Sequence, residues 1–192
     1  MPFDLDILYF FNQTIASPTL DPIMIALTSV KVWTPVYILV ALLLIYYKRW
    51  VGVRLVVSTA VLVGLVNLTT NVAVKPLVAR ERPCAINFSS GERAVPWVRL
   101  PDGMRLGYSF PSSHAVNNFA GVVFFIVLYR RRKSLYWLLV PATIVSLTRP
   151  YLGLHYPSDI FGGMLLGALC GYGWVWVHRY FERRLFPVYK SV

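Results

Sequence analysis

The segment RPYLGLHYPSD, residues 149–159, is a short polar interruption between two apolar runs. Arg149 precedes a proline, a position biased away from helical geometry, so we expect the upstream helix to end there. Pro157 suits the first turn of the next helix, where its missing N–H leaves no bond unmade. His155 and Asp159 are four residues apart, so the carboxylate can hold one imidazole nitrogen and fix the tautomer. These groups predict a site for an anion that undergoes chemistry, with three unrelated interfacial residues as the alternative.

Composition predicts a membrane protein with a single membrane-embedded domain over residues 1–192. The chain is 57% hydrophobic and 14% charged, with a mean hydropathy of +0.58, which is too apolar for a soluble domain. Its net charge of +11 does not indicate nucleic-acid binding, because the cations lie mainly between apolar runs. The start of the chain is acidic and unlike a cleavable signal peptide. We find no metal-ligand spacing and too few cysteines for a disulfide framework.

The apolar runs predict an all-α fold, a polytopic transmembrane bundle of five long spans plus a short N-terminal helix. That helix, residues 3–14, is too short to cross at about 1.5 Å per residue, so we expect it at the interface; six spans follow if it crosses. The first span carries Lys31 and Pro35, which predict a kink or two pieces. The spans are expected over residues 22–47, 53–74, 112–129, 135–148 and 158–178. The fourth is short and is expected to extend by a few residues at either end, and an extracytoplasmic loop is expected over residues 76–110.

Two polar or small-residue patterns within the spans are interpreted as packing features. A stripe of glycines repeats every four residues in the last span and allows another helix to approach closely: Gly163, Gly167 and Gly171. Polar residues near the end of the second span are typical of interhelical hydrogen bonds: Asn67, Thr69, Thr70 and Asn71.

Basic clusters give the expected orientation. They occupy two short loops and the tail, all on one side of the bundle: Lys48, Arg49, Arg54, Arg130, Arg131, Arg132, Lys133, Arg179, Arg183, Arg184 and Lys190. By the positive-inside rule this side is cytoplasmic, which leaves the N-terminus, the long loop and residues 149–159 outside. Six cations go against the bias and suggest an anionic ligand there: Lys75, Arg80, Arg82, Arg93, Arg99 and Arg105.

Three stretches reach this exterior boundary: KPLVARERP at 75–83, FPSSH at 110–114 and residues 149–159. Short connections between spans are expected to bring them together. Three cations could then surround the oxygens of a phosphoryl group: Lys75, Arg82 and Arg149.

The remaining groups suggest the chemistry. Pro111 and Ser112 open a helix whose free N–H groups favour an anion, although Ser112 is most simply a helix cap. His114, one turn in, can donate or accept a proton, although a lone histidine there is usually only a hydrogen-bonding group. His155 braced by Asp159 is the better nucleophile.

The order and spacing of these residues resemble the three-part signature of the type-2 phosphatidic acid phosphatase family of integral-membrane lipid phosphatases. The resemblance extends from about residue 22 to the end of the last span. It implies that His155 attacks phosphorus to form a phosphohistidine, with Asp159 orienting it and His114 protonating the leaving oxygen. It assigns phosphate binding to Lys75, Arg82, Arg149, Ser112 and the amide of Ser113, and it implies no metal or other cofactor.

The chain departs from the family pattern at two positions. Ser113 stands where glycine is usual, so the backbone there must tolerate a Cβ atom. Thr148 precedes Arg149 where serine is usual and keeps the hydroxyl.

The resemblance implies a lipid phosphate or diphosphate as substrate, with lipid A 1-phosphate and undecaprenyl diphosphate favoured. It also implies a bacterial inner-membrane location with the site facing the periplasm, and no obligatory protein partner is evident. Phosphatidylglycerol phosphate and phosphatidic acid remain alternative substrates. A lipid phosphotransferase, a haloperoxidase and a non-enzymatic lipid carrier are the other classes.

Overall fold

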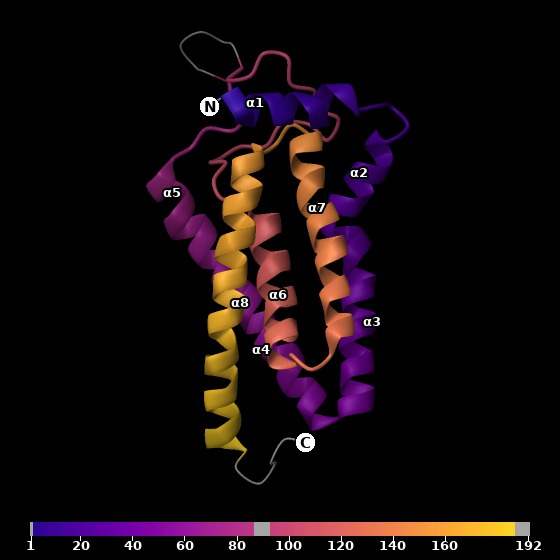
Figure 1. Cartoon of the computed structure of the whole chain (residues 1–192), viewed down its shortest axis with the longest axis vertical. Coiled ribbons are helices and arrows are strands. Elements are labelled where there is room, and N and C mark those ends of the chain that lie inside the picture. Colours follow the sequence, from indigo (N-terminus) through magenta and orange to yellow (C-terminus); the bar gives the residue numbers. More distant parts are fainter. Residues whose placement is uncertain (1, 87–92, 187–192) are drawn as a thin grey trace.

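The computed structural model describes residues 2–86 and 93–186, and within them the chain is helical with a single isolated β-bridge, Ile86 to Arg93. The longer helices run along the long axis, and α1 lies across one end of the bundle (Figure 1). The elements in order are α1 (Pro2–Tyr9), η1 (Phe10–Thr14), α2 (Asp21–Thr28), α3 (Val30–Lys48), α4 (Trp50–Thr69), η2 (Thr70–Val74), α5 (Lys75–Val78), α6 (Ser113–Leu128), η3 (Lys133–Leu138), α7 (Leu139–Tyr151) and α8 (Pro157–Leu185).

The bundle has the features of a multi-pass membrane protein. Among the described residues, three helical segments are long and apolar enough to cross a membrane: Val30–Lys48, Trp50–Val78 and Pro157–Leu185. No residue of α3 is buried, and its apolar side chains are exposed, as lipid-facing side chains would be. The expected all-α membrane bundle is therefore confirmed, whereas the count of five crossings stays a prediction. The N-terminal helix lies across the bundle end rather than along it (Figure 1).

The first and second expected spans differ in detail from the expectation. The first forms two pieces, as one of the two alternatives predicted, but they separate at Ser29, whose ψ of 121° is extended, and Pro35 lies inside α3. The second continues to Val78, so Lys75 lies in the last helical turns rather than beyond them. The π-helical segment η2 ends just before Pro76. A π-helical turn is wider than an α-helical turn, and its altered hydrogen-bond pattern is compatible with the missing N–H of the proline.

The expectation that a helix ends at Arg149 is wrong, because α7 continues to Tyr151 with Pro150 inside it. Since the helix ends one residue after the proline, little backbone hydrogen bonding is lost. The last turn is stabilised by burial of Tyr151 in a cluster with Cys84, Leu152 and Leu154. Pro157 and Asp159 lie in the first turn of α8, as predicted.

The glycine stripe of α8 packs against α6, as expected. A Cβ atom at Gly167 would overlap the Val116 carbonyl oxygen, and one at Gly171 would overlap that of Ala120. This close approach brings the start of α6 to the start of α8, where the Ser112 amide donates to the Asp159 carbonyl oxygen at 3.1 Å. The glycine stripe therefore joins two of the three stretches of the expected site.

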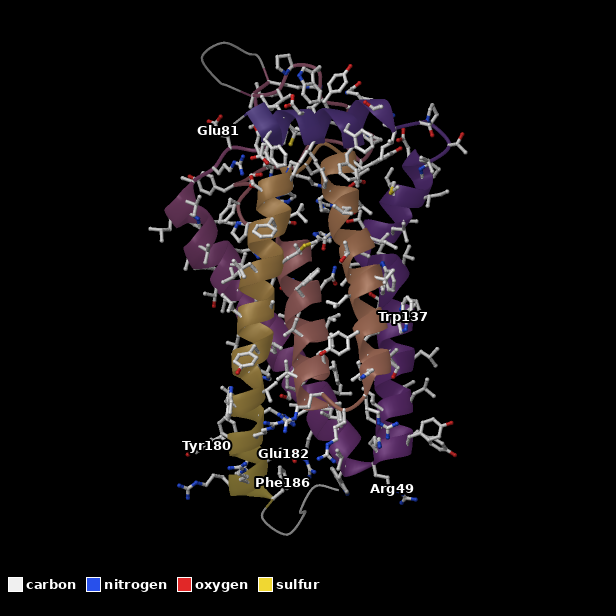
Figure 2. The ribbon with its side chains drawn as sticks, viewed as in Figure 1. Arg49, Glu81, Trp137, Tyr180, Glu182 and Phe186 are labelled. Atoms are coloured by element: carbon white, nitrogen blue, oxygen red, sulfur yellow. The ribbon has the colours of Figure 1, made fainter. Side chains whose placement is uncertain are left out.

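Charged residues lie at both ends of the bundle. Glu81 lies at the end beneath α1, whereas Arg49, Glu182 and Phe186 lie at the opposite end (Figure 2). At that second end Arg54 Nε pairs with Glu182 Oε1 at 2.5 Å. Lys190, counted among the basic tail residues, lies outside the described residues.

Candidate active site

A cavity of about 630 Å³ opens between α2, α3, η2, α5, α6, α7 and the loop before α6. Six of the residues expected in a phosphate site line it: Lys75, Arg82, Ser113, His114, Arg149 and His155. The structure thus brings together all three stretches, including both histidines. Asp159 and Ser112 do not line the cavity, and both are fully buried.

His155 presents one ring nitrogen to a cation and the other to a carboxylate. Its Nε2 lies 3.0 Å from Arg82 Nη1, and because guanidinium only donates, Nε2 accepts and the proton belongs on Nδ1. Nδ1 lies 3.5 Å from Asp159 Oδ2, longer than a normal hydrogen bond. Burial lowers the pKa of His155 to about 3; Asp159 opposes this effect, and Arg82 and Arg149 add to it. The imidazole is therefore neutral near pH 7, with an accepting nitrogen at the cavity.

The Asp159 carboxylate is held by donors from three segments. Its Oδ2 accepts from the Ser109 hydroxyl and from the Tyr156 amide at 2.8 Å, and its Oδ1 accepts from Arg80 Nη1 at 2.6 Å. The start of α8 adds the favourable field of the helix dipole. Sequence reasoning gave no role to Ser109 and counted Arg80 only among the exterior cations.

Each of the three expected phosphate-binding cations donates at least one hydrogen bond to a protein oxygen. Arg82 donates to the carbonyl oxygens of Gly107 at 3.1 Å and Leu154 at 2.9 Å. Lys75 Nζ donates to Asn71 Oδ1 at 2.9 Å. Arg149 Nη1 donates to Thr28 Oγ1 at 2.9 Å, whereas its buried Nε has no partner among the described residues. Burial lowers the pKa of Arg82. A bound anion would therefore stabilise the buried positive charge of its guanidinium.

Thr28, the last residue of α2, contacts two site residues. Its carbonyl oxygen lies 3.3 Å from His114 Nε2, and its hydroxyl accepts from Arg149. Thr28 is buried. The sequence gives no sign of this role, because it depends on the helix break at Ser29.

The two serines of the middle motif differ in placement. Ser112 is the N-cap residue of α6, but its buried hydroxyl has no partner among the described residues. Ser113 Oγ lies in the cavity lining and donates to Asn71 Oδ1 at 3.3 Å. Ser113 is helical and is not among the residues with positive φ, so the backbone tolerates its Cβ atom without strain.

Three further charged residues line the cavity away from His155: Lys31, Asp102 and Arg105. Arg105 pairs with Asp102 at 2.9 Å. Lys31 lies in the first turn of α3. The cavity lining therefore contains more cations than are needed to bind a single phosphoryl group.

Comparisons with known proteins identify the family of the chain. A family model described as PAP2 superfamily matches residues 51–183. A lipid A 4′-phosphatase from Bacteroides thetaiotaomicron is 34% identical over 95% of this chain and 80% of its own length. An undecaprenyl-diphosphatase from Sulfolobus acidocaldarius is 33% identical over 78% of this chain and 66% of its own length.

Two solved structures share the fold. A PAP2-type phosphatidylglycerolphosphate phosphatase from Bacillus subtilis superposes with a TM-score of 0.65 at 22% identity, covering 98% of this chain and 88% of its own. LpxE from Aquifex aeolicus gives a TM-score of 0.65 at 20% identity, covering 89% of this chain and 93% of its own.

Proposed function

The chain belongs to the PAP2 superfamily, and we propose that it hydrolyses a lipid phosphate or lipid diphosphate through a phosphohistidine. One observation carries the proposal: His155 presents an accepting Nε2 to a cavity whose walls hold Lys75, Arg82 and Arg149. A neutral imidazole among fixed cations suits nucleophilic attack on a phosphoryl group, because the cations offset the charge of the pentacoordinate state.

In the first step, Arg82 Nη1 turns from His155 Nε2 to a phosphoryl oxygen. The freed lone pair of Nε2 attacks phosphorus, and the bond from phosphorus to the leaving oxygen breaks. His114 donates a proton to that oxygen. Nδ1 keeps its proton, so the ring gains positive charge, which Asp159 stabilises. Lys75, Arg82 and Arg149 bind the phosphoryl oxygens, and the Ser112 hydroxyl and Ser113 amide contribute further donors at the start of α6.

In the second step, water attacks the phosphohistidine. His114, now deprotonated, takes a proton from the water, and the bond from phosphorus to Nε2 breaks. Inorganic phosphate leaves, and His155 returns to its neutral form. This chain supplies every proton transfer in the scheme, and no step is assigned to a metal or other cofactor.

For the lipid, we favour a phosphate of lipid A. The support is the relative named lipid A 4′-phosphatase, which matches 95% of this chain; the 1-phosphate and the 4′-phosphate are both candidates. Undecaprenyl diphosphate is the second candidate, favoured by a named relative and by the additional cations Lys31 and Arg105 in the cavity wall. The lipid chains would lie among the helices while the headgroup reaches the cations.

We place the site on the extracytoplasmic face of a bacterial inner membrane. The basic clusters at the opposite end of the bundle support this orientation.

The test is phosphate release by the full-length protein in detergent micelles. The panel contains lipid A 1-phosphate, lipid A 4′-phosphate, undecaprenyl diphosphate, phosphatidylglycerol phosphate and phosphatidic acid. We expect turnover of at least one member, none by His155→Ala, and inhibition by orthovanadate. His178→Ala is the matched control, because His178 contacts Ser58 of α4 and does not line the cavity.

Each other class has its own outcome. Release by His155→Ala comparable to wild type would overturn the phosphohistidine scheme. Transfer of the phosphoryl group to an added lipid or sugar acceptor in preference to water would make the protein a phosphotransferase. Lipid translocation in liposomes by a protein without turnover would make it a carrier.

A further inference from the structure

Arg80 lies between two carboxylates at the end of the bundle beneath α1. Its Nη1 donates to Asp159 Oδ1 and to Ser158 Oγ, each at 2.6 Å, and its Nη2 donates to Asp4 Oδ2 at 2.8 Å. The guanidinium also lies 4.2 Å from the centre of the Tyr156 ring. Arg80 does not line the cavity, so any effect it has on the reaction must pass through Asp159.

Asp4 is the second carboxylate, and it reaches this cluster from the first turn of α1. It accepts from the Ser158 amide at 2.9 Å and from the Ser158 hydroxyl at 2.5 Å. Burial by itself would raise the pKa of Asp4, but the bonds from Ser158 and Arg80 outweigh it and lower the pKa. Burial opposes the charge of Arg80 too, yet Asp4 and Asp159 raise its pKa. Asp4 and Arg80 are therefore held in their charged forms.

Charge balance gives this cluster a consequence for the nucleophile. An Asp159 carboxylate turned away from the ring would stabilise positive charge on the imidazole less well. If Arg80 paired with Asp159 alone, its positive charge would offset the negative charge of Asp159. Because Arg80 also pairs with Asp4, it offsets the charge of Asp159 only in part. The three groups carry a net charge of about −1 when ionised, which leaves Asp159 a field to exert on His155.

We propose that Arg80, itself held by Asp4, is a positioning residue that keeps the Asp159 carboxylate aimed at Nδ1 of His155. This inference rests on the nucleophilic role proposed above for His155. It makes the N-terminal helix part of the support of the active site rather than only a cover over the bundle end.

The competing interpretation is a purely structural link between α1 and the bundle. A second ion pair in the same region has that character: Arg99 Nη2 and Asp21 Oδ2 lie 2.7 Å apart and join the long loop to the start of α2. Neither residue lines the cavity or contacts Asp159. This pair therefore provides matched controls, Arg99→Gln for Arg80→Gln and Asp21→Asn for Asp4→Asn.

The experiment measures two properties of the full-length variants Arg80→Gln, Arg80→Lys and Asp4→Asn. The first is steady-state hydrolysis of whichever lipid phosphate the wild type accepts. We expect kcat of Arg80→Gln to fall about 100-fold, as for a misplaced reacting group, with KM within about twofold of wild type. Lysine should restore part of the loss, and Asp4→Asn should lose less than Arg80→Gln.

The second property is the titration of the His155 ring, followed by NMR with labelled histidine. The groups that face His155 are Arg82 from the loop, Arg149 from α7 and Asp159 from α8, with Lys75 and His114 across the cavity. In Arg80→Gln the Asp159 carboxylate should lose its aim at Nδ1, so the pKa of His155, which Asp159 raises, should fall further. The Arg99→Gln control should leave it unchanged.

Each outcome decides between the two interpretations. Wild-type kcat and an unchanged His155 titration in Arg80→Gln would overturn the proposal. So would a loss of kcat equal to that of Arg99→Gln with no change in the titration. If Arg80→Gln does not fold, Asp4→Asn and Arg80→Lys provide the same comparison. If the wild type hydrolyses no lipid phosphate, the proposed function fails, while the titration still tests the positioning role.

Discussion

At the scale of single residues, the chemistry depends on keeping one imidazole neutral among several cations. His155 is 2% exposed, and Arg82 Nη1 donates to its Nε2. The same cations that would bind a phosphate thus disfavour protonation of the nucleophile. Asp159 lies on the other side of the ring and opposes this effect only in part.

The first prediction concerns the pH dependence of His155. With a pKa of about 3, the ring should remain neutral as the pH falls from 7 to 5, since protonation begins only near the pKa. An ordinary histidine, with a pKa of about 6.5, would be mostly protonated at pH 5. Nitrogen shifts of the labelled ring should therefore show, at pH 5, a neutral imidazole with its proton on Nδ1. A midpoint near pH 6.5, assigned by loss of the signal in His155→Gln, would contradict the prediction.

The second prediction concerns Lys31 and substrate choice. If Lys31 contacts the second phosphate of a diphosphate, Lys31→Gln should lower kcat/KM for undecaprenyl diphosphate about tenfold, near the lower range for a charge-assisted hydrogen bond. The value for a lipid monophosphate should change less than about threefold. Lys133→Gln, at the start of η3, is the control. An equal loss with both substrates would assign Lys31 a role other than recognition of the second phosphate.

At the scale of elements, the close packing of α6 on α8 fixes the separation of the two histidine-bearing segments. The glycine stripe allows the backbones to approach, and the Ser112 amide bonds to the Asp159 carbonyl oxygen where the two helices begin. Widening this contact would move His114 relative to His155 without altering any site residue.

The third prediction tests that contact with a pair of matched substitutions in α8. Gly167→Ala places a Cβ atom against the Val116 carbonyl oxygen, whereas Gly173→Ala meets nothing within 4 Å. Overpacking costs about 1–3 kcal/mol, so Gly167→Ala should lower the thermal midpoint by several degrees and reduce kcat. Gly173→Ala should leave both unchanged or raise the midpoint slightly. Equal behaviour of the two variants would remove the role given to the stripe.

The helices themselves were predictable from the apolar runs, but two of their ends were not. The bias against helix before Pro150 was outweighed by burial of Tyr151, a tertiary effect that a local rule omits. The supporting groups of the site were missed for a similar reason. Asp4 contacts Arg80, 76 residues away, and Ser158, 154 residues away, and no spacing in the sequence predicts such contacts. The residues predicted to line a phosphate site, by contrast, belong to short motifs next to span ends.

At the scale of the whole molecule, the groups proposed for the chemistry gather at one end of the long axis. The cavity and α1 occupy one end, and the turn after α6 and the end of α8 occupy the other (Figure 1). A lipid headgroup at the membrane surface could thus reach the cations while its chains remain beside apolar helices. This arrangement requires that the cavity end face the compartment from which substrate arrives.

The last prediction concerns that orientation. Glu81 lies at the cavity end (Figure 2), Arg132 lies in the turn between α6 and η3, and both are exposed. In a background with Cys84→Ala and Cys170→Ala, the Glu81→Cys variant should react with a membrane-impermeant maleimide in intact spheroplasts. The Arg132→Cys variant should react only after the membrane is permeabilised, because the positive-inside rule places that turn in the cytoplasm. Reaction of Arg132→Cys alone in intact cells would reverse the orientation, and the substrate would then have to be a phosphate of the cytoplasmic leaflet.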